Sequence, residues 1–395
     1  MAWDHFLWVA GSLLALVWFS RIVDAALGMH KIADIAHAEW DRYPRGNPRV
    51  SIIVPARNEE ADIEQTLTNL LALDYDNYEI IAVNDRSEDR TGAIMDECAA
   101  GQCGEGAPRR PRLTVLHVRD LPEGWLGKTH AMWTAAKQAT GDWLLFTDAD
   151  VIFKPDSVRR ALSYAETAHA DHLVMFPQII MKTPGERMMI AFFQTLFVFG
   201  HRPWKVADPS TDDHIGVGAF NLVRRSVYEA VGTYERLRLE VLDDMKLGKA
   251  VKDGGYVQRN VFGEDLISLY WARGTLGIVR NLSKNFFAIL SFEWPRTILT
   301  VLTLAFLNLW PFAGIVLAHG AARVPYAIAL ASLFLIYVGM SWKSPIRPYY
   351  FFLHPISSTV FIYILLQSMC LTLWRGGVVW RGTKYPLEQL RKGRV

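Results

Sequence analysis

Two aspartates, Asp148 and Asp150, directly follow the apolar run Trp143 to Thr147 in the segment GDWLLFTDADVIFKPDS. A strand that ends in this way directs both carboxylates off its end, where they can share one hard cation that bridges diphosphate oxygens. The pair alone is a weak signal. A polar turn between a strand and a helix, with Asp156 as the capping carboxylate, would have a similar sequence.

Apolar runs that end in polar residues recur along this part of the chain. The pattern predicts strands at Val50–Val54, Tyr78–Val83, Leu113–Val118 and Trp143–Thr147, with helices after them. We expect Pro55 to end the first strand and Asn58 to cap the first helix. This alternation predicts an α/β fold with a mostly parallel sheet, which binds its ligands beyond the carboxyl ends of the strands.

Four other segments are long, apolar and almost free of charge: Phe6–Phe19, Ile298–His319, Val324–Trp342 and Phe351–Trp374. Runs that approach ~20 residues are candidate membrane spans. The first lacks the basic leader and the clear cleavage site of a secretory signal, so we interpret it as an uncleaved anchor. The predicted organisation is an anchor at 1–30, a soluble domain at 45–270, an interfacial segment at 271–295, a transmembrane region at 296–374 and a basic tail at 375–395.

Basic residues predict the orientation of the chain in a membrane. Arg21, Lys31 and Arg42 follow the first apolar run and no basic residue precedes it. The positive-inside rule then places the N-terminus outside and the soluble domain in the cytoplasm, as expected for an integral protein of a bacterial cytoplasmic membrane. Four full spans would put the basic tail outside, against the same rule. Either the segment 351–374 is not a simple crossing or one span is miscounted, and the number of crossings stays open.

Charge and cysteine content exclude some classes of function. The formal net charge of +2 gives no reason to expect binding to nucleic acid. Cys98 and Cys103 have no histidine or further cysteine at ligand spacing, so we expect neither a zinc site nor a disulfide. The segment from Met188 to Trp204 is rich in Phe and Met. It is either an interfacial helix beside a lipid or a buried core helix.

Five blocks in the chain resemble, in order, those of the family 2 glycosyltransferases. They are SIIVPARNEE, IIAVNDRSEDRTG, GKTHAMWTAAKQATGDWLLFTDAD, GVGAFNLVRRSVYEAVG and VLDDMKLGKAVKDGGY. The resemblance covers residues 49 to about 260 and implies the nucleotide-sugar-binding type A fold. The apolar segments on both sides, with the terminal WRGGVVWRGTKYP, resemble the membrane-bound branch that includes hopene-associated, carotenoid-acid and ceramide glycosyltransferases.

The resemblance implies a donor site in the first three blocks. The block that flanks the nucleobase is matched by Pro55, Ala56, Arg57 and Glu59. Asp85 matches the acidic residue that accepts hydrogen bonds from the base or ribose, although Asn84 stands where the family usually has a first aspartate. Lys128 begins a predicted helix, where its charge and the free N–H groups could meet phosphate. Alternatively, Lys128 only begins a surface helix.

The two acidic motifs have different implied roles. Asp150 matches the metal ligand of the family, with Asp148 contacting ribose or completing the coordination of Mg²⁺ or Mn²⁺. Asp243 and Asp244 match the acidic pair that supplies the catalytic base. Alignment through the following leucine makes Asp244 the base and Asp243 its neighbour. Acidic residues at a helix N-terminus are also stabilised by the macrodipole alone, so the pair could be structural.

The acceptor side is less well specified. The block GVGAFNLVRR resembles the acceptor-side block, whose small residues let a substrate approach the backbone, or it is a strand with a glycine bulge. No QxxRW signature of processive synthases follows Asp244, so addition of a single sugar is favoured. The nearest aromatic and basic groups, which could stabilise the leaving diphosphate, are Trp271, Arg273, Arg280 and Lys284, or Trp374, Arg375, Trp380 and Arg381.

These patterns together predict an inverting, metal-dependent transfer of a hexose from a nucleotide diphosphate, such as UDP-hexose, to a membrane lipid. The lipid acceptor would resemble a hopanoid, carotenoid or sphingolipid. A processive polysaccharide synthase and a catalytically silent membrane scaffold are the alternatives. The identities of the sugar, the base and the lipid are not encoded in recognisable motifs, and neither is the oligomeric state.

Overall fold

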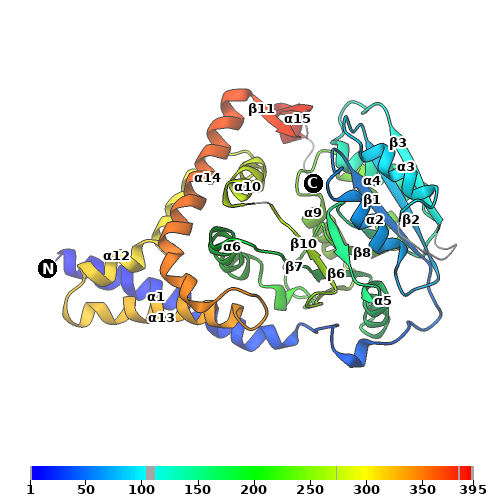
Figure 1. Ribbon diagram of the computed structural model, residues 1–395. Helices are drawn as coiled ribbons and strands as arrows, with labels where there is room; N and C mark the ends of the chain where they lie inside the picture. Colours follow the sequence, from blue (N-terminus) through cyan, green and yellow to red (C-terminus); the bar gives the residue numbers. More distant parts are fainter. Residues whose placement is uncertain (1, 104–111, 273, 381–382, 393–395) are drawn as a thin grey trace. The chain divides into compact units, whose positions relative to one another are not determined.

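The computed structural model describes residues 2–103, 112–272, 274–380 and 383–392, which fall into two compact units (Figure 1). The sheet unit contains Ile32–Ile180, Lys205–Tyr270 and Glu388–Val395. The helical unit contains Met1–Lys31, Met181–Trp204 and Trp271–Leu387. The segment 181–204, which lies inside the expected soluble domain, therefore clusters with the apolar helices.

The sheet unit is built on a seven-stranded sheet in the order β3-β2-β1-β4-β8-β6-β9. Its strands are β1 (Val50–Ala56), β2 (Tyr78–Asp85), β3 (Arg112–Val118), β4 (Trp143–Phe146), β6 (His172–Phe176), β8 (Asn221–Arg224) and β9 (Gln258–Phe262). Adjacent strands are parallel except for β8, which runs antiparallel to both of its neighbours. The prediction of an α/β fold with a mostly parallel sheet is confirmed.

Helices and a small second sheet complete this unit. The helices are α2 (Ile63–Leu71), α3 (Thr91–Ala99), α4 (Gly127–Gln138), α5 (Ser157–Thr167), α7 (Arg225–Ala230), α8 (Thr233–Arg236), α9 (Asp243–Asp253) and α15 (Leu387–Lys392). The second sheet joins β5 (Val151–Phe153), β10 (Ile267–Leu269) and β7 (Gln178–Ile179). Apolar residues of α4 and α9 pack with those of β1, β2 and β4 in one buried cluster, which fixes the start of both helices near the strand ends.

Two local expectations about the first strand and helix are wrong. Strand β1 continues through Pro55 to Ala56, because β4 pairs with β1 only as far as Ile53 and the missing N–H of Pro55 therefore breaks no ladder bond. Helix α2 begins at Ile63, and Asn58 does not cap it. Asn58 adopts a left-handed backbone with a φ of 56°, and its side chain accepts a hydrogen bond from the backbone N–H of Glu88.

The expectation for the cysteines is also wrong, because Cys98 and Cys103 form a disulfide. Cys98 lies in the last turn of α3, and Gly101 follows with a φ of +82°. This left-handed turn reverses the chain and brings the two Cα atoms to 4.5 Å, within the usual range for a disulfide.

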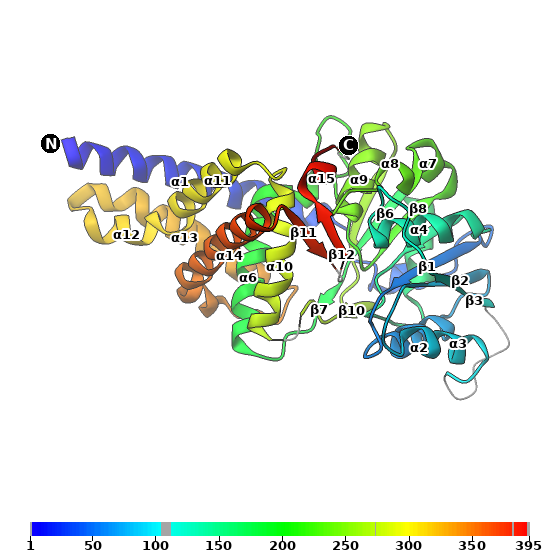
Figure 2. The ribbon, with the colours of Figure 1, turned by 90° about the horizontal axis from the view of Figure 1, so that it is seen from above.

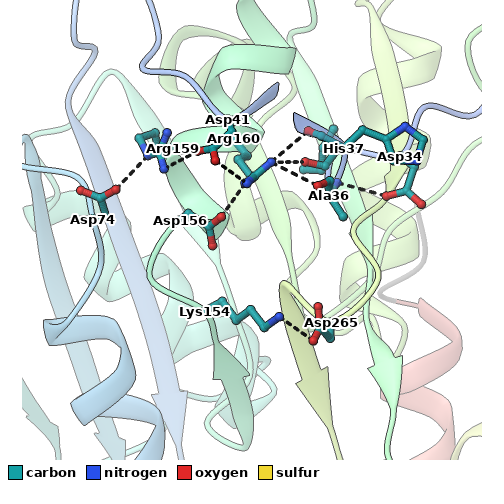
Figure 3. A network of polar contacts seen from close by, with 11 residues as sticks. Asp34, Ala36, His37, Asp41, Asp74, Lys154, Asp156, Arg159, Arg160 and Asp265 are labelled. Atoms are coloured by element: carbon teal, nitrogen blue, oxygen red, sulfur yellow. Dashed lines mark hydrogen bonds and ion pairs between the residues drawn. The ribbon is translucent and has the colours of Figure 1, made fainter. Parts of the chain in front are cut away.

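An ionic network fastens the N-terminal end of the sheet unit to α5 (Figure 3). Arg160 donates to the carbonyls of Ile35, Ala36 and His37 and pairs with Asp41 at 3.0 Å. Arg159 pairs with the same aspartate at 2.7 Å. The chain between the first apolar helix and β1 is therefore part of the folded sheet unit.

The helical unit contains the long apolar segments. Its helices are α1 (Ala2–Gly28), α6 (Pro184–His201), α10 (Thr275–Ile289), α11 (Trp294–Asn308), α12 (Trp310–Leu317), α13 (Arg323–Met340) and α14 (His354–Arg375), followed by the hairpin of β11 (Gly377–Trp380) and β12 (Thr383–Pro386). Both views show α1, α12 and α13 side by side (Figures 1 and 2).

Among the described residues, three segments are long and apolar enough to cross a membrane: Ala2–Lys31, Gly320–Met340 and Pro348–Arg375. The expected span at Ile298–His319 is not one straight helix. It bends by 47° between α11 and α12, immediately before Pro311. Proline interrupts the hydrogen-bond ladder of a helix, which explains the break.

Candidate active site

The loops after β1 and β2 interlock at the carboxyl ends of these two strands. The backbone N–H of Asn58 donates to Ser87 Oγ at 3.1 Å, and that of Glu59 donates to Thr91 Oγ1 at 2.8 Å. Pro55 and Ala56 are buried as the last residues of β1, Arg57 is buried and Glu59 is half-buried. The predicted nucleobase-flanking segment is thus held in one fixed loop.

Asp85 is buried at the end of β2 and forms a two-point ion pair with the next residue. Arg86 Nε lies 2.8 Å from Asp85 Oδ1, and Arg86 Nη2 lies 3.2 Å from Oδ2. A Cβ atom on Gly127, the first residue of α4, would lie 2.2 Å from Asp85 Oδ2. Glycine at this position therefore lets the N-terminus of α4 approach the ion pair. The sequence analysis missed Arg86.

Lys128 links the two acidic motifs. Its Nζ lies 2.8 Å from Asp148 Oδ1 and 3.5 Å from Asp243 Oδ1, and its side chain is only 12% exposed. Burial alone would lower the pKa of Lys128, but the charges of Asp148, Asp243 and Asp244 outweigh it and raise the pKa. Lys128 is therefore a buried ammonium group between the motifs and not the start of a surface helix.

Asp148 and Asp150 lie between β4 and β5, as the apolar run before them predicts. The Asp148 side chain is 37% exposed, and its backbone N–H donates to Gly218 O. Burial raises the pKa of Asp150 to about 7, with further contributions from the negative charges of Asp148 and Glu59. Concentrated negative charge of this kind favours binding of a cation.

Asp243 and Asp244 occupy the first turn of α9, and their environments differ. The Asp243 side chain is 5% exposed and faces Lys128. Asp244 is half-buried, and its carboxylate accepts the backbone N–H of Met245 at 2.7 Å. Burial raises the pKa of both aspartates, while Lys128 opposes the shift. Asp244 is the more accessible of the two to a substrate.

Two glycines of the GVGAF block bring the acidic motifs together. A Cβ atom on Gly218 would lie 2.5 Å from Asp148 Oδ2. One on Gly216 would overlap the backbone oxygen of Asp244. The missing side chains of these glycines therefore leave room for Asp148 and Asp244 of the same chain. The sequence analysis had assigned this room to a substrate.

The donor set suits a divalent cation shared with a diphosphate. Within the described parts of the chain, no three His, Cys, Asp or Glu side chains converge on one metal position. Asp148 and Asp150 would supply two carboxylates, and Mg²⁺ or Mn²⁺ usually completes such a set with phosphate oxygens and water. The residues fit a cation that binds together with the donor.

An aromatic group at the start of α4 was also missed. The Trp125 ring contacts His130 edge to face at 5.4 Å and packs on Trp133 at 4.9 Å between ring centroids. Burial lowers the pKa of His130, while the charge of Asp85 opposes the shift. The spacing of these residues in GWLGKTHAMW gave no clear signal, because it is equally typical of an ordinary amphipathic helix.

The described members of the predicted aromatic and basic groups belong to the helical unit and not to the sheet unit that contains this site. Trp271, Arg280, Trp374 and Arg375 belong to the helical unit. Arg273 and Arg381 lie outside the described residues, and the side chains of Lys284 and Trp380 are not described. Their proposed contact with the leaving diphosphate stays a prediction.

The mostly parallel sheet with acidic loops at its carboxyl ends agrees with the type A glycosyltransferase fold that the sequence resemblance implies. Residues 51–232 match the model of Glycosyl transferase family 2. The chain is also similar to the mannosyltransferase PcManGT from Pyrobaculum calidifontis, solved with GDP-Man and Mn²⁺. That match has a TM-score of 0.50 and 19% identity, and covers 93% of this chain and 99% of the other.

The curated relatives include 4,4'-diaponeurosporenoate glycosyltransferases of Staphylococcus haemolyticus and Staphylococcus aureus. They are 26% identical over 205 residues and 27% identical over 204 residues, respectively, which is 51% of this chain in both cases. The chain spans about half the length of these relatives, 51% and 50%. The resemblance to a carotenoid-acid branch of family 2 is confirmed at this level of similarity.

Proposed function

We propose that this protein transfers one sugar from a nucleotide diphosphate to a lipid in the membrane. The observation that carries the proposal is the position of Lys128, which is ion-paired with both Asp148 and Asp243. The donor-side and acceptor-side motifs of the family thus share one ionic cluster. A transferase needs both halves within reach of a single sugar.

On the donor side, each residue has a role suited to its surroundings. Asp85 accepts hydrogen bonds from the ribose or base, while the two-point contact with Arg86 fixes the direction of this carboxylate. Lys128 contacts diphosphate oxygens from the first turn of α4. Asp148 and Asp150 would hold the divalent cation, which neutralises the charge that develops on the leaving diphosphate.

On the acceptor side, Asp244 is the better candidate for the general base because Asp243 is buried against Lys128. The acceptor oxygen forms a bond to the anomeric carbon as the bond to the diphosphate breaks, and the proton of a hydroxyl acceptor moves to Asp244. Attack on the face opposite the diphosphate inverts the anomeric configuration. A carboxylic acid acceptor would already be ionised at neutral pH and would need no base.

A lipid acceptor is supported by the apolar helices and by the name of the curated relatives, which refers to a carotenoid acid. Transfer of a single sugar is supported by the absence of the QxxRW signature after Asp244. Both features favour a lipid product over a polymer.

The test is incubation of membranes carrying this protein with radiolabelled UDP- and GDP-sugars, with Mn²⁺ or with EDTA. For the variant Asp244→Asn, the matched control is Asp253→Asn, because Asp253 lies exposed at the far end of the same helix. We expect label in the organic phase, carrying one sugar per lipid and lost with EDTA. A long water-soluble polymer would favour the synthase alternative, and failure to bind any nucleotide sugar would favour the scaffold.

A further inference from the structure

Helix α14 has an apolar exposed face and a packed face that buries several polar residues beside Phe361, Ile364 and Leu365. Ile356, Tyr363 and Trp374 are 54%, 57% and 83% exposed along one side. The opposite side buries the polar residues His354, Ser357, Ser358, Ser368 and Thr372. A helix that faces water shows the reverse arrangement, so the exposed side of α14 suits contact with lipid.

Hydrogen bonds join the packed face to two shorter helices of the same unit. Ser357 Oγ donates to the carbonyl of Met188 in α6 at 3.3 Å. Ser283 Oγ of α10 donates to Gln367 Oε1 at 3.1 Å, and the N–H of Phe287 donates to Ser368 Oγ at 3.1 Å. Helix α14 therefore lies beside α6 and α10, and it also packs against α11.

Neither of these two helices can cross a membrane. Helix α6 has 18 residues, and the chain on both sides of it, ending at Ile180 and resuming at Lys205, belongs to the sheet unit. A single helix between two points on the same side cannot be a crossing. Helix α10 follows Tyr270 of the sheet unit closely and carries the exposed Arg280 near its middle. A charge there would lie in the hydrocarbon if α10 crossed.

The remaining length of α14 is too short to cross by itself. Its 22 residues give a helix roughly 33 Å long, and the part from Ser357 to Ser368 accounts for roughly 17 Å beside α6 and α10. The last turns, after Ser368, extend roughly 10 Å, against a hydrocarbon thickness of ~30 Å. Strand β11, which follows, packs against both α14 and α10.

We infer that α14 lies along the surface of the lipid bilayer on the side of the sheet unit, with Ile356, Tyr363 and Trp374 in contact with lipid. The membrane crossings are then α1, the bent pair of α11 and α12, and α13. Figure 1 shows α14 running across the direction that α1, α12 and α13 share. This inference does not depend on the proposed function.

Three crossings place the C-terminal tail on the same side as the sheet unit. The loop after α13, which carries Lys343 and Arg347, also lies on this side. Both then agree with the positive-inside rule, which a fourth crossing would violate for the tail. The sequence left open a conflict between four spans and a basic tail on the inside. This conflict disappears if the segment 351–374 is not a crossing.

The decisive experiment measures the depth of spin labels in reconstituted bilayers. In a background with Cys98, Cys103 and Cys370 changed to serine, the labels are placed by Ile356→Cys, Tyr363→Cys and Trp374→Cys. We expect three similar, shallow depths. A crossing helix would instead separate the first and last labels by up to roughly 27 Å and put Tyr363→Cys near the bilayer centre, which would overturn the inference.

Helix α13 provides the matched control, because Val324, Ile328 and Leu335 are exposed along it. Labels introduced by Val324→Cys, Ile328→Cys and Leu335→Cys should lie at increasing depth, from the interface toward the bilayer centre.

A second readout compares labelling of Gly46→Cys, in the sheet unit, with a cysteine appended after Val395, using a membrane-impermeant maleimide. Both cysteines should react from the same side. Reaction from opposite sides would overturn the inference even if the protein transferred no sugar.

Discussion

Two buried polar clusters of the sheet unit differ in charge. In the first, which we call the His172 network, His172 lies between Asn221 and Gln258 and is hydrogen-bonded to both. Gln258 also accepts from the backbone N–H of Ile215 at 3.0 Å. Burial lowers the pKa of His172 to about 4, so the network is neutral near pH 7. Every group there has a partner within the protein, as is typical of structural networks.

The second cluster is the acidic site around Lys128, where carboxylates outnumber the ammonium group. Burial and mutual repulsion raise the pKa values of Asp150 and Asp243. Burial of like charges costs folding free energy, and a bound cation would offset this cost. The comparison supports the proposal that the acidic site binds a ligand, whereas the His172 network contributes stability. Each prediction below tests one side of this difference.

The largest expected effect is that of Asp150→Asn on turnover. Loss of the cation ligand should remove several kcal/mol of charge stabilisation, a fall of more than ~10³-fold in rate. The same change removes a buried like charge, so the free energy of unfolding in EDTA should rise. Activity assays and chemical denaturation of the purified protein measure the two effects.

For Asp150→Asn, the matched control is Asp265→Asn, since Asp265 is exposed and pairs with Lys154 at 2.5 Å on the protein surface. This change should leave turnover and stability nearly unaltered. Full activity of Asp150→Asn in EDTA would remove both the metal role and the contrast with the His172 network.

The next effect concerns Asp244→Asn, which keeps the shape of the side chain and removes its basicity. For a hydroxyl acceptor, turnover should fall by ~10²- to 10⁴-fold with nucleotide-sugar affinity unchanged, because general-base assistance has that size. Asp243→Asn should reduce turnover less. Calorimetry and single-turnover kinetics separate binding from chemistry.

Three outcomes for the Asp244 and Asp243 pair are informative. If Asp243→Asn slows turnover and Asp244→Asn does not, the base is Asp243. If neither slows the chemical step while Asp150→Asn abolishes it, the acceptor is ionised already, as expected for a carboxylic acid. If donor binding is lost instead, the pair belongs to the donor site.

The sequence predicted the acidic motifs because each follows a strong local pattern: an apolar run before Asp148 and a helix start at Asp243. It could not predict which carboxylates meet Lys128, since that depends on packing between β1, β4 and α9. The pair of Asp85 and Arg86 was missed for a different reason. Arg86 adopts a left-handed backbone with a φ of 55°, which turns its side chain back onto Asp85. No periodic pattern in the sequence indicates such a conformation.

The errors in the fold also have local causes. The bend of 47° within the apolar run 298–319 was not predicted, although Pro311 lies beside it in the sequence. The disulfide depends on the turn at Gly101, whose left-handed backbone the spacing of Cys98 and Cys103 did not reveal. Strand and helix types were predictable from periodicity, whereas these features depend on the conformation of single residues.

A smaller effect is expected for the pH dependence of stability. Burial lowers the pKa of His172 in the folded protein to about 4, below the ordinary histidine value of 6.5, so the unfolded chain binds the extra proton between these values. Its contribution is fully present above pH 6.5 and is lost as the pH falls toward 4, by about 3 kcal/mol in total.

The variant His172→Gln should be less stable at pH 7 but should lose less stability than the wild type between pH 7 and pH 5. Chemical denaturation at both pH values measures the free energy of unfolding of each protein. The titration of the carboxylates is common to both proteins and cancels when their pH dependences are subtracted. Equal pH dependence in the two proteins would show that His172 is not held in its neutral form.

The smallest expected effect is that of Gly218→Ala, which joins the two regions because Gly218 lies between the acidic site and β8. The added Cβ atom would lie 2.5 Å from Asp148 Oδ2. Because the carboxylate is at the end of a flexible side chain, the protein should fold normally and Asp148 should rotate away. We expect a loss of about tenfold in donor affinity, or about 1.4 kcal/mol, measured by calorimetry with a nucleotide sugar and Mn²⁺.

For Gly218→Ala, the control is Gly339→Ala, since no atom lies within 4 Å of its added Cβ. An unchanged affinity in Gly218→Ala would mean that Asp148 does not contact the donor in its observed orientation, and Asp150 would then be the principal protein ligand of the cation.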